Sequence, residues 1–347
     1  MALAGAYKLF DQENDVVKNI KATISSGIWS SGANTLTAGM YFTQSAQSSS
    51  TGNYFFDVYK TSPATDTEAE IQFSLAYGHL HGSGSLGTVG AATGNRASAA
   101  IHAQVVNLVL PPNTDRFTYA NSTTSKHFFV VSLKRARMRE KMDPGNWELH
   151  LSGSSKKVGD NIRLIDDSGA TTNPTSGIGG RVFNVVTGSI STGTAVINTA
   201  AASNPGGGYG LFYPDLGLIV LNADVVNASA SISVTETSNV INSNTLEFFK
   251  SVKGGAYFQA RREEKLSSTH YFVRAGNKEF NFSNNPTFFT SSTGDFTQPT
   301  FFKDPKVYIT TVGLYNDSNE LLAVAKLSQP VLKSYSREAL IKVKLDF

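Results

Sequence analysis

The last segment of the chain constrains the fold most, because hydrophobic and polar residues alternate strictly in it. Apolar side chains stand at every second position, Ile341, Val343, Leu345 and Phe347, and Lys or Asp stands between them. A period of two is that of a β-strand with one buried face. We therefore expect a strand that continues to the final residue and buries its apolar face against its own sheet or a partner subunit.

Strand-like patterns recur along most of the chain. Residues 70–77 alternate in the same way, and residues 307–315 and 321–327 flank the turn-forming residues 316–319, which predicts a hairpin. Further strands are expected at 54–59, 103–110, 127–133, 147–151, 162–165, 181–186 and 216–221. The predicted fold class is mainly β with short helices, built from antiparallel, sandwich-like sheets and ending in a hairpin and a terminal strand.

Two segments have helical spacing instead. In residues 11–25, Val16, Ile20 and Ile24 recur at intervals of four, which predicts a helix. Residues 244–266 form the second expected helix, with a break at Gly254 and Gly255.

Residues 78–100 are rich in Gly, Ser and Ala, and we expect a long mobile loop there, of a kind that is often functional or ordered only by a partner. We divide the chain into an N-terminal β-rich region, 1–125, which contains this loop, and a C-terminal β-rich structural domain, 126–347.

Composition favours assembly over chemistry. Charged residues make up 16% of the chain, against about 25% in a typical soluble domain. Interface cores are depleted in Lys, Glu and Asp, so such a composition suits a protein covered by neighbours. The chain has no cysteine, which excludes disulfides, thiolate metal sites and a cysteine nucleophile. We expect no membrane contact and no export signal, since no run approaches the ~20 apolar residues of a membrane helix and residues 1–10 lack a signal-peptide core.

No enzymatic motif stands out. The segment Gly82–Gly87 matches the dinucleotide pattern G-x-G-x-x-G, but neither an amphipathic helix nor a ribose-binding carboxylate follows at the required distance. The pattern G-x-S-x-G is absent, and pairs such as Asp166–Asp167 are adjacent, so their side chains do not face one another on a strand. We expect a protein that is not an enzyme, with no catalytic residue and no cofactor.

Three histidines, His79, His81 and His102, could offer imidazoles to a metal ion. His79 and His81 would share a face on a strand, but a closed site needs further ligands and the nearest acidic residues, 66–70, form a separate patch. We assign no metal ligand, and whether these histidines bind an ion stays open.

The basic run of residues 134–141 is the strongest charge cluster. It contains Arg135, Arg137 and Arg139, and it lacks the interleaved aromatic residues that stack on nucleic-acid bases. With a net charge of only +3, we expect no nucleic-acid partner. Arginine is favoured at interfaces because its planar guanidinium forms bidentate pairs, so we interpret the run as a strand edge at a subunit contact, with a solvated face as the alternative.

Three strings resemble virion structural proteins of the T-even-like myoviruses that infect marine cyanobacteria. They are FFVVSLKRARMREKMDPGNWELHL (128–151), GLFYPDLGLIVLN (210–222), and residues 267–347 with their NNPTF and YITTVGLYNDSNELLAVAKLSQP stretches. They cover about a third of the chain, and none is a catalytic signature. The arrangement of the C-terminal hairpin and terminal strand is similar in outline to the dimeric wedge protein of T-even baseplates.

The resemblance implies a structural subunit of a contractile phage tail, assembled in the host cytoplasm and located in the virion. Its partners would be other tail or baseplate proteins and further copies of itself in a symmetric assembly. The candidate interface residues are Arg135, Arg137, Arg139, Trp147, Ile341, Val343, Leu345 and Phe347.

The sequence leaves other functions open. One alternative is a tail-fibre or receptor-binding protein, in which Trp29, Tyr41 and Tyr54 could stack on sugars. A neck or capsid component and a tail-borne cell-wall hydrolase are the others. Position in the particle, copy number and neighbours are not encoded in any recognisable pattern.

Overall fold

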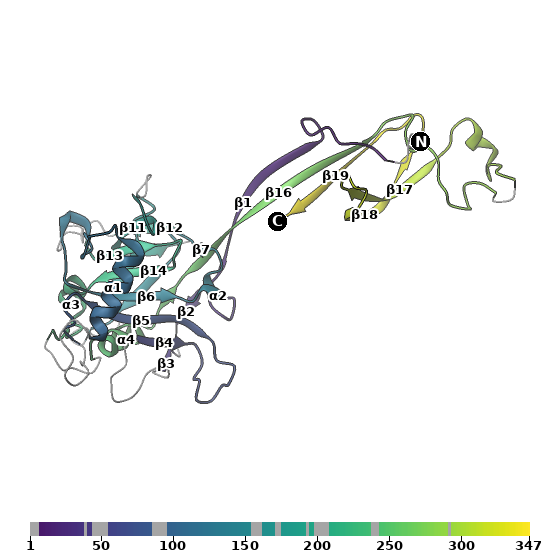
Figure 1. Ribbon diagram of the computed structural model, residues 1–347. Coiled ribbons are helices and arrows are strands. Elements are labelled where there is room, and N and C mark those ends of the chain that lie inside the picture. Colours follow the sequence, from purple (N-terminus) through teal and green to yellow (C-terminus); the bar gives the residue numbers. More distant parts are fainter. Residues whose placement is uncertain are drawn as a thin grey trace. The chain divides into compact units, whose positions relative to one another are not determined.

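The computed structural model describes residues 7–37, 40–43, 55–84, 96–153, 162–170, 175–191, 194–197, 208–236, 243–290 and 293–347 (Figure 1). The chain is mainly β with short helices and antiparallel sheets, as the sequence predicts. It divides into unit 1, residues 1–23 and 265–347, and unit 2, residues 24–264. The expected boundary at residue 125 differs from this division, because β5 (Ile71–His79) and β6 (His127–Leu133), from its two sides, pair with each other.

Unit 2 is built on one large antiparallel sheet that curls into a half-barrel. Across the sheet the strands are β2 (Thr35–Leu36), β15 (Phe258–Gln259), β8 (Glu148–Leu151), β9 (Ile162–Asp166), β11 (Gly180–Ser191), β13 (Gly210–Tyr213), β14 (Leu218–Asn222), β6, β5, β4 (Phe55–Tyr59) and β3 (Tyr41–Thr43), with β10 (Thr175–Gly177) and β12 (Thr194–Ile197) paired to β11.

Both faces of the central strands are buried. Along β6, Phe128 and Val130 pack on one side with residues of α1 (Ala97–Val109), and Phe129 and Val131 pack on the other with residues of α4 (Ser243–Gly255). This explains the continuous apolar runs of β6 and β14, since a strand covered on both faces has no polar side to alternate with. Figure 1 shows α1 crossing in front of β5 and β6. A third helix, α3 (Ala223–Ala230), follows β14 directly.

One strand prediction and one helix prediction are wrong. Residues 103–110, expected as a strand, lie in α1, whose buried positions Ser98, His102, Val106 and Val109 have helical spacing. Two of these four are polar, so the helical stripe is hidden from a reading of hydrophobic residues alone. Conversely, the expected helix at 11–25 is strand β1 (Val16–Gly27), which lies beside β16 (Arg261–Ala275).

The second expected helix is confirmed as far as its glycine pair: α4 ends at Gly255, and the chain then continues as β15 and β16. The expected long loop at 78–100 is shorter than predicted. Its first residues complete β5 and form turns up to 84, residues 85–95 lie outside the described part, and α1 begins at Ala97.

Unit 1 has two layers of strands. In one, β16 is flanked by β1 and by β19 (Ala339–Asp346), and Tyr271 lies opposite Val343. The other is the predicted hairpin, β17 (Val307–Tyr315) with β18 (Leu321–Lys333). Leu314 of the hairpin packs with Ile341 and Val343 of β19 in one cluster.

The remaining short elements are η2 (Ala120–Ser122), α2 (Arg135–Met138), β7 (Lys141–Met142) and η5 (Pro299–Phe302). None of the helices in the described ranges is long and apolar enough to cross a membrane.

Candidate functional site

One face of β5 and β6 ends in a cluster of polar side chains in unit 2. Tyr77 lies opposite Phe129, and the next pair on the same face is His79 opposite His127, two residues later in β5 and two residues earlier in β6. Because side chains two apart share a face of a strand, the apolar ladder of this face continues directly into a tyrosine and two histidines. All three polar side chains are buried, with 2–3% of each residue exposed.

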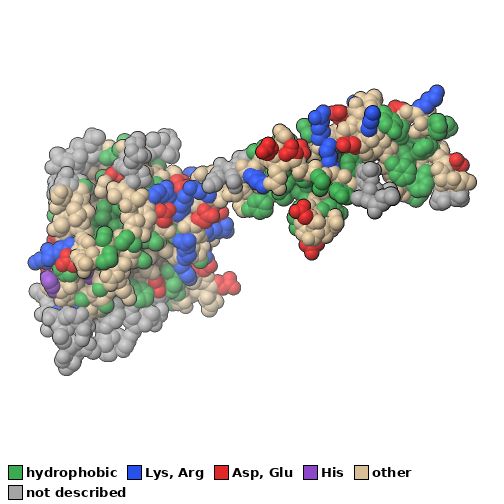
Figure 2. Space-filling view, turned by 45° about the horizontal axis from the view of Figure 1, so that its top comes forward, with side chains coloured by type: hydrophobic (Ala, Val, Ile, Leu, Met, Phe, Trp, Pro, Cys, Tyr) green, Lys and Arg blue, Asp and Glu red, His purple; other side chains and the backbone are tan. Residues whose placement is uncertain are grey.

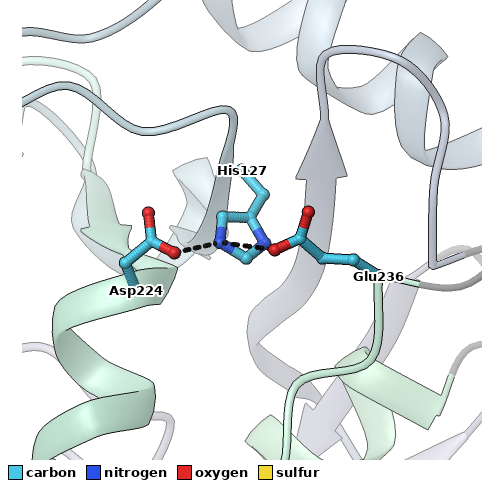
Figure 3. Close-up of side chains that lie close together, drawn as sticks. All are labelled: His127, Asp224 and Glu236. Atoms are coloured by element: carbon cyan, nitrogen blue, oxygen red, sulfur yellow. Dashed lines mark hydrogen bonds and ion pairs between the residues drawn. The ribbon is translucent and has the colours of Figure 1, made fainter.

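His127 is the centre of the cluster. Its Nδ1 lies 2.8 Å from the Tyr77 hydroxyl, and its Nε2 lies 2.8 Å from Asp224 Oδ1 and 3.8 Å from Glu236 Oε1 (Figure 3). The ring therefore lies between the two carboxylates, and the Tyr77 hydroxyl contacts its other nitrogen. With neutral imidazole, Nε2–H donates to Asp224 and Nδ1 accepts from Tyr77.

Asp224 is placed by the start of α3. The Asn222 side chain caps this helix by accepting a hydrogen bond from the Asp224 amide, 3.1 Å away. The carboxylate is also held by Ser125, whose hydroxyl lies 2.6 Å from Oδ2. The pKa of Asp224 is lowered, chiefly because His127 donates a hydrogen bond to the charged form and Ser125 adds another.

Glu236 is placed by the segment before α4. Asn244, fully buried in α4, accepts from the Thr235 amide and donates to the Thr235 carbonyl, both at 2.8 Å. This pair of bonds fixes the backbone next to Glu236. The Glu236 side chain is 53% exposed and that of Asp224 57%, whereas that of His127 is 4% exposed.

His79 supports Glu236 from the other side. Its Nδ1 accepts from the amides of His81 and Ser83 at 3.0 and 3.3 Å, so the proton of the neutral ring is on Nε2, which lies 3.4 Å from Glu236 Oε2. Burial lowers the pKa of His79, which favours this neutral form.

The cluster has the geometry to bind a metal ion but not to activate its tyrosine. His127 Nε2 and carboxylate oxygens of Asp224 and Glu236 lie within 4.8 Å of one another, close enough to share a metal ion. Tyr77, in contrast, is not an activated nucleophile, because burial and the charges of Glu236 and Asp224 raise its pKa and keep the phenol protonated.

The three histidines singled out in the sequence do not form one site. His79 belongs to the cluster, while the ring of His102 packs on Phe128 with centroids 5.1 Å apart. The amide of His81 bonds to His79, but the His81 ring makes no hydrogen bond to a described member of the cluster. The sequence did not single out His127, Asp224 or Glu236, and it did not show that Tyr77 makes a polar contact. The one available signal was the alternation of β5, which places His79 on the same face as Tyr77.

The predicted interface arginines lie in unit 2 around α2, which is a short helix and not the expected strand edge. Arg137 pairs with Glu70 at 2.7 Å and Arg139 with Glu264 at 3.2 Å, while Arg135 donates to the Asp215 carbonyl at 3.3 Å. Their partners thus belong to the same chain. An additional contact to another subunit stays a prediction.

Trp147 is fully buried and packs against Phe212 in the core of unit 2, so it is a core residue and not a surface contact. In β19 the predicted alternation is confirmed for three of its four apolar residues: Ile341 and Val343 are 7% and 5% exposed, and Leu345 is partly buried in the same cluster. The prediction is wrong for the last residue, because the strand ends at Asp346 and Phe347 is 72% exposed. The aromatic residues considered as sugar contacts lie in different environments. Trp29 is a core residue, Tyr41 is 42% exposed, and Tyr54 lies outside the described residues.

Unit 1 carries a surface rich in exposed hydrophobic side chains (Figure 2). Its large hydrophobic residues at or above 50% exposure are Tyr7, Leu9, Phe282, Phe302, Tyr308, Tyr315, Leu321, Leu322, Val324, Tyr335, Leu340 and Phe347. In the described part of unit 2 only Leu108, Ile178 and Val196 reach that level.

No protein-family model, curated protein or solved structure matches the chain.

Proposed function

We propose that this protein is a structural subunit of a contractile phage tail, a baseplate wedge component that docks to further copies of itself through unit 1. The observation that carries the proposal is the exposed apolar surface of unit 1. Large apolar patches of this kind on an otherwise soluble protein mark sites of interaction.

The β17–β18 hairpin concentrates this surface. Its inner face packs on β19, and its outer face presents Tyr308, Tyr315, Leu322 and Val324, which are 64%, 59%, 68% and 57% exposed. An isolated two-stranded hairpin is marginally stable at best in water, so each further layer packed on it adds to its stability. A further layer over the outer face would bury these four side chains.

A second copy of the chain suits this face. Among the described residues of the two strands, Lys326 is the one charged residue on this outer face. The face therefore lacks the charge that binding to a nucleic acid or a charged ligand needs. Two-fold symmetry brings the same patch of two subunits together, and a patch that is apolar on one copy then meets an apolar patch on the other.

The sequence resemblance adds the context of the particle. The longest resembling stretch, 267–347, lies entirely in unit 1, which carries the exposed surface. β19 is also the edge strand of its sheet in the described part, so its outer N–H and C=O groups are available for strand addition by a neighbour.

Cryo-electron microscopy of the virus particle tests the assignment to the baseplate. Density for this chain in a six-fold ring beneath the tail tube is the expected result. Density at fibre tips, in the neck or on the capsid would refute the wedge assignment and favour the receptor-binding or capsid alternatives.

Light scattering coupled to size exclusion tests the docking surface in solution. We expect the purified chain to form dimers or larger oligomers and the Leu322→Glu variant to be monomeric. Ile178→Glu is the matched control, since Ile178 is 62% exposed but lies in unit 2, and it should leave the oligomer intact. A monomeric wild type, or equal effects of the two variants, would contradict the proposal.

A further inference from the structure

The polar cluster of unit 2 has no part in docking through unit 1, and its geometry points to a ligand of its own. We infer that His127, Asp224 and Glu236 bind one divalent transition-metal ion, with Zn²⁺ as the ion that their chemistry fits. The proposal is independent of the assignment to a phage tail.

The distances are close to those of a metal site. With Zn–N and Zn–O bonds of about 2.0–2.2 Å in tetrahedral geometry, two ligand atoms stand about 3.4 Å apart. His127 Nε2 lies 2.8 Å from Asp224 Oδ1 and 3.8 Å from Glu236 Oε1. One pair must therefore widen and the other shorten by roughly half an ångström. Both carboxylates are more than half exposed, so their side chains have room for that adjustment.

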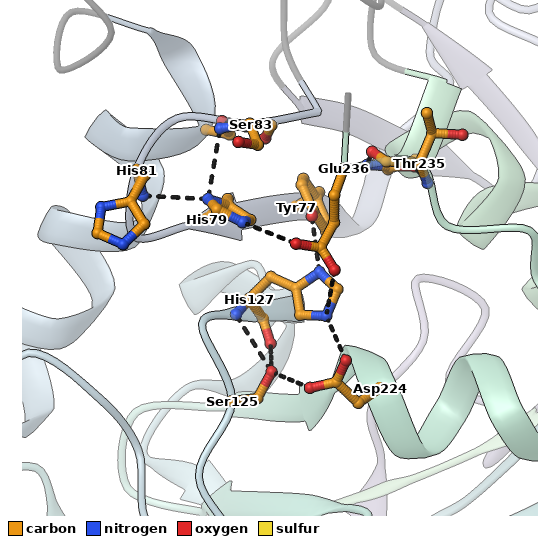
Figure 4. Close-up of polar contacts among 11 residues, drawn as sticks. Tyr77, His79, His81, Ser83, Ser125, His127, Asp224, Thr235 and Glu236 are labelled. Carbon is orange, nitrogen blue, oxygen red and sulfur yellow. Dashed lines mark hydrogen bonds and ion pairs between the residues drawn. The ribbon is translucent and has the colours of Figure 1, made fainter. Parts of the chain in front are cut away.

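Each ligand also has the supporting partner that metal sites require. A ligating histidine has its second ring nitrogen fixed by a hydrogen bond, and ligating carboxylates are themselves hydrogen-bonded. Tyr77 holds Nδ1 of His127, Ser125 holds the second oxygen of Asp224, and His79 holds the second oxygen of Glu236. Nε2 of His127 is thereby aimed between the two carboxylates (Figure 4).

The charges call for a cation. Two carboxylates converge on one imidazole that is almost completely buried, and their ligand atoms lie within 4.8 Å of each other. A divalent ion takes the place of the proton on Nε2 and neutralises both carboxylates at once. The ring then carries its proton on Nδ1, which donates to the Tyr77 hydroxyl oxygen. Since the carboxylates face solvent, the ion can reach the site without opening the core.

The ligand types select the ion. Imidazole nitrogen favours zinc and its neighbours over Mg²⁺ and Ca²⁺, and carboxylate oxygen is a normal zinc ligand. His79 is not a fourth ligand, because its Nδ1 accepts two backbone N–H groups and its Nε2 therefore carries a proton. Three protein ligands leave one position for water.

The ion would join segments that are distant in sequence: the start of β6, the first turn of α3 and the segment before α4. Binding to the folded state alone stabilises that state by mass action. Zinc should therefore raise the melting temperature of unit 2 as well as bind stoichiometrically.

Isothermal titration of the untagged full chain with Zn²⁺ after chelator treatment tests the inference. We expect one ion per chain, a rise in melting temperature, and a loss of affinity of at least tenfold in both Asp224→Asn and Glu236→Gln. Tyr77→Phe, which removes the hydroxyl that supports Nδ1, should weaken binding about 10–100-fold. His270→Ala, which removes an imidazole from unit 1, is the matched control and should bind as the wild type does.

Circular dichroism and the melting temperature without zinc show whether the variants fold, and both carboxamide variants keep the size of the original side chain. Absence of saturable binding by the folded wild type overturns the inference. Equal binding by the wild type, Asp224→Asn and Glu236→Gln overturns it as well, because the ion would then be held elsewhere.

Discussion

Two neighbouring residues of β19 should differ sharply in their contribution to the stability of unit 1. Ile341 is 7% exposed and belongs to the small cluster between the two strand layers, whereas Leu340 points the other way and is 66% exposed. Replacing either with Ala removes three carbon atoms. The pair therefore isolates the effect of burial from that of chemistry and position.

The magnitude follows from the exposed fractions. At about 0.8 kcal/mol per buried CH₂, three carbons are worth ~2.4 kcal/mol when fully buried. Ile341→Ala forfeits nearly all of this and leaves a cavity, so we expect a loss of about 2–4 kcal/mol. Leu340 is only one-third buried, so Leu340→Ala should cost about 0.8 kcal/mol.

Hydrogen exchange measured by mass spectrometry on peptides from β16 and β19 is the appropriate assay. Both tryptophans, Trp29 and Trp147, lie in unit 2, so their fluorescence does not report on unit 1. With tenfold per 1.4 kcal/mol, the slowest amides of β16 should exchange at least ~25-fold faster in Ile341→Ala and about fourfold faster in Leu340→Ala. Measurements on dilute, monomeric protein keep intermolecular burial of Leu340 out of the comparison.

Equal acceleration by the two substitutions would refute the reasoning, since it would mean that β19 does not bury one face against the hairpin. Acceleration by Leu340→Ala that grows with protein concentration would show instead that this face is covered in the oligomer.

Two predictions concern unit 2. Phe248, fully buried and stacked on Phe129 with ring centroids 4.4 Å apart, should cost about 3–5 kcal/mol when replaced by Ala, measured by tryptophan fluorescence in urea. A loss below ~1 kcal/mol would contradict its place in the core. Glu148 is buried, which raises its pKa, but hydrogen bonds from His150 and the Ile190 amide outweigh this and lower it below its ordinary 4.5. Its stabilising contribution is therefore present above pH 4.5 and is lost as pH falls through the lowered pKa of the folded state. Glu148→Gln should flatten the decline of stability in acid, and an unchanged decline would exclude Glu148 as a cause.

Local sequence patterns predicted several elements correctly, because the alternation of a strand or the residues of a turn can be recognised without knowing what the element packs against. The alternation of β19 and the turn residues between β17 and β18 determine strand and hairpin directly, since a period of two has only one regular solution. The uninterrupted apolar run of β6 likewise marks a strand between two buried layers.

The spacing of hydrophobic residues predicted the wrong element in two situations. Either the apolar residues fit both a helix and a strand, or some of the buried positions are polar. Val16, Ile20 and Ile24 are compatible with a helix, but pairing with β16 makes the segment a strand. In α1 the buried Ser98 and His102 interrupt the apolar stripe. Such choices are made by tertiary contacts, which override local preference.

The polar cluster shows the same division more sharply. The sequence by itself predicted the strand as far as Tyr77 but assigned His79 to the loop after it, and the structure extends β5 to His79. Only the tertiary structure brought His127 opposite His79, Asp224 to the start of a helix and Glu236 beside them, from segments up to 157 residues apart. The register of a strand pair and the packing of helices on a sheet depend on contacts between distant parts of the chain, and a site built across them has no signature in local spacing.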